Sequence, residues 1–274
     1  MPTAHHRERA LVIALLVSMV LWNLPFGGFL LYPFKLLATW LHEMSHGIVM
    51  IFTGAGFDHL EIYRDTSGIA YGTAGVGPAA RAAIASAGYM GAATFGALFL
   101  VLGQSRSGAR SILGIVGAAL TISALVWVRN PFGIAMVGVG AGVCLLLAAF
   151  AGERAAVYAV NFVAAQSCIN AVLDIRVLFR TEMVINGEVV GASDAHNMAG
   201  ATFGNHWLWA GVWLAWSFAA FYFALRKISR VTVQTASDGS DPSARPTEAP
   251  RDESDCNDPR QSQATAQPDT ARSA

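Results

Sequence analysis

The chain has 274 residues, of which 54% are hydrophobic and only 13% are charged, and its formal net charge is zero. Soluble domains usually carry about 25% charged residues, so this composition excludes an ordinary soluble protein. The balanced charge gives no electrostatic reason to expect binding of nucleic acid. The three cysteines show no CxxC or paired spacing, so neither a disulfide framework nor a zinc ribbon is expected.

Long apolar runs dominate the sequence. A helix needs about 17–25 apolar residues to cross the roughly 30 Å hydrocarbon core of a bilayer. Residues 111–128 and 131–152 contain no Asp, Glu, Lys or Arg. We therefore expect an all-α polytopic membrane protein, a bundle of about six or seven transmembrane helices. Pro33 falls between the first two apolar segments, where a proline does least harm to a helix. The seven segments are Ala10–Leu31, Phe34–Phe52, Pro78–Leu102, Arg110–Val128, Pro131–Phe150, Arg154–Asp174 and Phe203–Leu225.

The composition changes at about Val231. Residues 231–274 are rich in Pro, Ser and Asp and nearly free of large apolar side chains. Such a segment cannot bury enough surface to offset its loss of conformational entropy, so we expect a disordered polar tail. Residues 1–230 are then the membrane domain. Basic residues flank both the first and the last apolar segment, so the positive-inside rule leaves the orientation open.

A short β-hairpin is predicted between the second and third apolar segments, at residues 58–73. "LEIYR" alternates apolar and polar side chains, and "RDTSG" is typical of a turn before "IAYGT". Unpaired strand edges cannot face lipid, so the hairpin must lie at the interface or be covered by protein. His59, Glu61 and Arg64 are expected on its solvated face.

The sequence "TWLHEMSHGIVM" places three ionisable groups in an apolar helix. His42 and His46 are four residues apart, so both lie on one helix face and can reach one tetrahedral Zn²⁺. Glu43 follows the first histidine and stands beside the metal, where a carboxylate can act as a general base. This is the HExxH arrangement of zinc peptidases. The alternative is a structural pair satisfied by neighbouring helices, but ionisable residues inside a span are functional by default.

The order of these parts resembles that of a known family. HEMSH in an apolar helix, then a hairpin, then the glycine-rich "SAGYMGAATFG" is similar to the site-2 protease family of intramembrane zinc metalloproteases. The pattern is closest to a divergent bacterial, peptidase-B-like branch, whose members carry an aspartate near a span end and a later "SDA" segment. Tyr89 and Met90 replace the proline-containing step of the family, and no LDG sequence is present. The resemblance implies a multi-pass protein of a bacterial cell membrane.

The resemblance also implies an aspartate as the third zinc ligand, and two candidates compete. Asp174 ends the sixth apolar segment, which would run in the same direction as the HEMSH helix if the fourth and fifth segments form an inserted hairpin. We prefer Asp174, with Asp194 as the alternative. Asp194 or Ser193 would also make a good N-cap for the last helix, and His196 is a further possible ligand. His206 lies among tryptophans and is not expected to bind metal.

The sequence therefore predicts a membrane-embedded zinc endopeptidase. Glu43 would activate the attacking water, and the substrate would be a membrane protein with a transmembrane segment that unwinds at the site. The family's mode of binding suggests strand addition to the hairpin. Asn170 would orient the peptide or, more simply, pack between helices. The alternative function is a non-proteolytic pseudoprotease that binds or escorts membrane partners.

Overall fold

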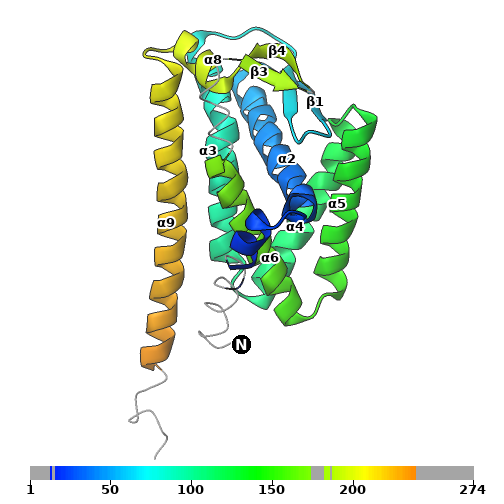
Figure 1. Cartoon of the computed structure of the whole chain (residues 1–274), viewed down its shortest axis with the longest axis vertical. Helices are drawn as coiled ribbons and strands as arrows, with labels where there is room; N and C mark the ends of the chain where they lie inside the picture. The colour runs from blue at the N-terminus through cyan, green and yellow to red at the C-terminus, as the bar shows by residue number, and fades with distance from the viewer. Residues whose placement is uncertain (1–12, 14–15, 174–181, 186, 239–274) are drawn as a thin grey trace, which may run out of the picture. The chain divides into compact units, whose positions relative to one another are not determined.

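The computed structural model describes residues 13, 16–173, 182–185 and 187–238 (Figure 1). Helices make up most of the described chain, and two small antiparallel hairpins accompany them. In chain order the elements are the helix Leu16–Asn23, α2 (Gly27–Thr53), β1 (Phe57–Ile62), β2 (Gly68–Gly72), α3 (Pro78–Leu102), α4 (Arg106–Val126), α5 (Pro131–Phe150), α6 (Glu153–Leu173), β3 (Glu182–Ile185), β4 (Glu188–Ala192), α8 (Asp194–Ala201) and α9 (His206–Asp238). The predicted all-α polytopic fold is confirmed.

Among the described residues, five helices are long and apolar enough to cross a membrane: α3, α4, α5, α6 and the first 23 residues of α9. The helix Leu16–Asn23 and α2 together make a sixth candidate, bent by 119° at the break between them. The structure thus supports six spans at most within these ranges, the lower of the two predicted numbers. The chain is an integral membrane protein.

The boundary predicted at Pro33 is wrong. Helix α2 runs through Pro33 without interruption, and the chain bends instead before Gly27. A Cβ on Gly27 would overlap the carbonyl of Leu21, so the sharp bend requires glycine at this position. Proline removes only one backbone hydrogen bond, which a bundle in lipid tolerates. Helix α2 ends at Gly54, whose φ of 79° is the left-handed conformation common after helix C-termini.

The hairpin predicted at residues 58–73 is confirmed as β1 and β2, with Leu60 opposite Ala70. The outer edge of β1 is also occupied. The Leu60 amide donates to the Trp127 carbonyl at 3.0 Å, and the Arg129 amide donates to the Leu60 carbonyl at 3.2 Å. Within the described part of the chain, β2 therefore provides the free edge of this sheet.

A second hairpin, β3 and β4, was not predicted. Its signal is the Asn186-Gly187 pair between short apolar runs, a typical two-residue hairpin turn, and Gly187 has a φ of 86°. The hairpin pairs Ile185 with Glu188 and leads directly into α8.

Small residues on α3 allow close packing against two neighbouring helices. A Cβ on Gly91 would overlap the Ser45 side chain of α2, and one on Gly96 would lie 3.0 Å from the Cys168 sulfur of α6. Helices without side chains at the contact approach closely in a membrane bundle. This packing brings α2, α3 and α6 together (Figure 1).

Helix α9 continues to Asp238, eight residues into the segment predicted to be a polar tail. Residues 239–274 lie outside the described residues.

Candidate metal centre

Helix α2 carries the three residues of the HEMSH motif. Its period places His42 and His46 on one face, and their Nε2 atoms are 3.0 Å apart. Glu43 and His46 are buried, at 5% and 6% exposure. The half-buried imidazole of His42, the buried imidazole of His46 and the buried carboxylate need partners that compensate for lost hydration.

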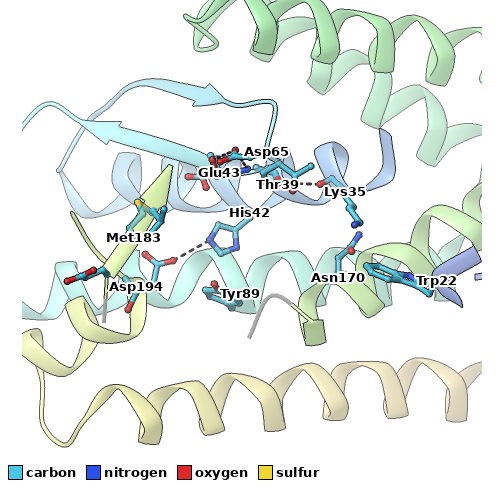
Figure 2. Close-up of a pocket in the computed structure, with 16 residues that line it drawn as sticks. Trp22, Lys35, Thr39, His42, Glu43, Asp65, Tyr89, Asn170, Met183 and Asp194 are labelled. Atoms are coloured by element: carbon cyan, nitrogen blue, oxygen red, sulfur yellow. Dashed lines mark hydrogen bonds and ion pairs between the residues drawn. The ribbon is translucent and has the colours of Figure 1, made fainter. Parts of the chain in front are cut away.

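Asp194 provides a third polar group at this point. Its Oδ2 lies 3.3 Å from Nε2 of His42 and 3.3 Å from Nε2 of His46. Asp194 is the first residue of α8, whose N-cap is Ser193; the Ser193 hydroxyl accepts from the His196 amide at 3.3 Å. The turn after β4 thus directs the carboxylate toward α2 (Figure 2).

The spacing of these atoms matches a zinc site. Ligands 2.0–2.1 Å from a tetrahedral zinc ion lie about 3.3 Å from one another. The three distances here are 3.0, 3.3 and 3.3 Å. Two imidazoles and one carboxylate leave the fourth position free for water or substrate, as catalytic zinc sites require. His42, His46 and Asp194 are therefore a ligand set that fits Zn²⁺.

The second ring nitrogen of His46 fixes its orientation. Nδ1 lies 2.6 Å from the carbonyl oxygen of Ile84, so Nδ1–H donates and Nε2 presents a lone pair. Burial alone would raise the pKa of the Asp194 carboxyl. When the neighbouring histidines are protonated, their charge and hydrogen bonds outweigh burial and hold that pKa below its ordinary value, so Asp194 is ionised. A zinc ion bound to the neutral imidazoles would supply the same positive charge.

Gly88 of α3 leaves the space that an ion would occupy. A Cβ at this position would overlap Nε2 of His42 and lie 2.5 Å from Nε2 of His46. The role of this glycine goes beyond close helix packing, because any side chain would fill the space directly against the two coordinating nitrogens.

Tyr89 stands beside Gly88 and holds the His42 ring. The two rings meet edge to face with centroids 4.6 Å apart, and the other side of Tyr89 stacks on Trp213 of α9 at 5.4 Å. Edge-to-face and offset pairs are the favourable aromatic arrangements. Tyr89, which replaces part of the family's proline-containing step, therefore supports the candidate ligand His42.

Two cavities flank the candidate centre. The Lys35 cavity, about 430 Å³, lies toward the β1–β2 turn and α6 (Figure 2). The Arg81 cavity, about 500 Å³, lies toward β4, α8 and the start of α3. Both are lined by Glu43, Asp194 and Met183, so they meet at the candidate centre. Met183 belongs to the unpredicted second hairpin, which forms one wall of each.

The other residues that the sequence suggested for the site are not among the clustered ligand atoms of the described chain. Asp174, the preferred third ligand, lies outside the described residues, and the preference stays a prediction. Asn170 lines the Lys35 cavity. His196 lines the Arg81 cavity and is not among the three clustered ligand atoms. His206 begins α9 beside Trp207.

The predicted solvated face of the first hairpin is held by local contacts. His59 stacks on Tyr71, and its Nδ1 lies 2.8 Å from the Asp58 carboxylate. Glu61 accepts a hydrogen bond from the Tyr63 hydroxyl. Arg64 is exposed and lies over the Phe132 ring. None of the three joins the clustered ligand atoms.

Comparison with known families gives one match. The sequence pattern of the family described as Peptidase M50B-like covers residues 10–224, which include every element from the HEMSH helix to most of α9. The chain belongs to the peptidase M50B-like family. This family lies among the site-2 proteases, so the resemblance seen in the sequence is confirmed. No curated protein and no solved structure matches the chain.

Proposed function

We propose that this M50B-like protein is an intramembrane zinc endopeptidase. The observation that carries the proposal is the meeting of His42, His46 and Asp194 at zinc spacing, in a centre shared by two cavities that both reach Glu43. Family membership supports metallopeptidase chemistry, and HExxH supports the assignment of the ligands and the base.

The chain's residues divide the chemistry between them. His42, His46 and Asp194 would hold Zn²⁺, which supplies a Lewis acid for the scissile carbonyl and makes hydroxide available near neutral pH. Glu43 takes the proton of the attacking water and returns it to the leaving amine nitrogen. Gly68 lies directly over Glu43: a Cβ there would come within 2.8 Å of its Cγ and 3.0 Å of its Oε1. The β2 backbone thus limits the space in which the Glu43 carboxylate can move.

The free edge of β2 supports binding of an extended substrate. Gly68 borders the Lys35 cavity, while Ile69 and Ala70 border the Arg81 cavity. A peptide that paired with this edge would pass both cavities and the candidate centre between them. An intact helix has no free backbone groups for such pairing, so the substrate segment must unwind locally. We propose a membrane protein with a transmembrane segment as the substrate.

The test compares Glu43→Gln with wild type in detergent. Both proteins should bind one zinc per chain, because glutamate is not a ligand, whereas cleavage of an unwound model substrate should fall by 10²–10⁴-fold, the usual contribution of a general base. Glu153→Gln, on α6 away from both cavities, is the matched control and should cleave normally.

Two results would contradict the proposal. If Glu43→Gln cleaves as fast as wild type, the carboxylate is not the base. If zinc-loaded wild type binds membrane proteins without cutting them, the chain is the non-proteolytic escort that is the alternative reading of its sequence.

A further inference from the structure

The two cavities differ in charge outside the candidate centre. The Lys35 cavity contains Lys35 together with two carboxylates, those of Asp65 and Glu182. The Arg81 cavity contains Arg81 and no further carboxylate among its lining residues apart from Glu43 and Asp194 of the centre. With a zinc ion in the centre, the described side chains that line the Arg81 cavity carry a net positive charge and those that line the Lys35 cavity a net negative one. The groove across the centre is therefore electrically polarised.

Arg81 is an exposed side chain at the rim of this cavity, and it has no acidic partner among the described residues. It forms no ion pair with any carboxylate of the described residues, and one of its side-chain nitrogens lies 3.5 Å from the Gly200 carbonyl of α8. That contact joins α3 to α8 and leaves the other guanidinium donors without a protein partner among the described residues, open to solvent or to a ligand. A guanidinium presents five donors in a planar fork that matches a carboxylate.

The position of Arg81 sets its distance from the reacting bond. It precedes Ile84 by three residues, and the Ile84 carbonyl accepts the hydrogen bond from His46 at 2.6 Å. Three helical residues span about 4.5 Å, so Arg81 lies one turn from the backbone that orients a zinc ligand. An extended chain advances about 3.3 Å per residue, so a carboxylate bound by the guanidinium would lie within a few substrate residues of the scissile bond.

The rest of the cavity suits an apolar chain with one anionic group. Ile69, Ile84, Ala85 and Val190 line its sides, and the polar His196 and Asn197 lie with Arg81 among its lining residues. Ile69 belongs to the free edge of β2, so a peptide paired with that edge enters this cavity directly.

We propose that Arg81 forms a subsite for a substrate carboxylate, within a few residues of the scissile bond. This inference rests on the proposed proteolytic function and adds a specificity to it. The carboxylate comes from an Asp or Glu side chain or from a free chain terminus, and both present the same group to the guanidinium.

The experiment uses the full-length, zinc-loaded protein in detergent and synthetic apolar peptides. A single Asp is moved along the peptide, with Asn at the same positions as the uncharged reference, and mass spectrometry locates the cut. A second set places the free C-terminal carboxylate at the same distance, compared with the amidated terminus. The readout is the ratio of kcat/KM for each charged peptide to that for its uncharged partner.

In wild type this ratio should reach about tenfold at one position, the usual strength of a charged hydrogen bond. Arg81→Gln should bring the ratio close to one, and Arg81→Glu should bring it below one, because the new carboxylate repels that of the substrate. Arg106→Gln is the matched control, an exposed arginine at the start of α4, beyond the opposite end of α3, and should keep the wild-type ratio. The set that shows the effect identifies the source of the carboxylate.

The failures of the two proposals are distinguishable. Cleavage by wild type with an equal ratio in Arg81→Gln overturns the subsite and leaves the proteolytic function standing. Absence of cleavage of every peptide by zinc-loaded wild type overturns both. Zinc content measured on each Arg81 variant confirms that the centre is intact, so a changed ratio reports binding of the carboxylate rather than loss of the metal.

Discussion

Replacement of Gly88 by alanine tests the metal centre through a single added carbon. The new Cβ would lie 2.5 Å from Nε2 of His46 and closer still to Nε2 of His42. To reach an ordinary contact of 3.4 Å, the His46 ring must move by about 0.9 Å. Coordination distances tolerate only about 0.2 Å. We therefore expect zinc affinity to fall by at least 10–100-fold, the range seen when the support of a ligand is lost.

Zinc content and competitive zinc titration measure this effect on protein purified in detergent. The control is Gly138→Ala on α5, where the added Cβ meets nothing within 4 Å. Both changes gain about 1 kcal/mol of helix propensity, so a difference between them reports the contact with the histidines. One zinc per chain bound at wild-type affinity in Gly88→Ala would refute the placement of the ion against α3.

Two further predictions concern the ligands and the metal. Asp194→Ala should lose stoichiometric zinc whereas Asp174→Ala should retain it, measured by metal analysis; the opposite result would restore the ligand preferred from the sequence. Removal of zinc by a chelator should lower thermal stability, because at free zinc 100-fold above its Kd the ion stabilises the fold by about 2.7 kcal/mol. An unchanged unfolding temperature in a scanning assay would show that no metal was bound to the folded state.

Hydropathy and local periodicity were sufficient to predict the long apolar helices and the first hairpin, but not the short helix α8, which Ser193 caps in place of the last helix. Bilayer thickness and backbone hydrogen bonding act on each segment separately, so their signals are local. The boundary at Pro33 was wrong because neighbouring helices support α2 around one missing donor. The second hairpin was missed although Asn186-Gly187 marks its turn, since its strands are only four and five residues long.

The sequence by itself determined the membrane class and two of the three candidate ligands, the histidines of the HEMSH motif. His42 and His46 share a helix face because four residues make one turn, which any α-helix guarantees. The third group at the centre was decided only by the tertiary structure, since Asp194 is 152 residues from His42. The Ile84 carbonyl and the space over Gly88 are likewise products of helix packing. A metal centre needs groups converging on one point, and convergence of distant segments follows from the packed bundle rather than from any local pattern.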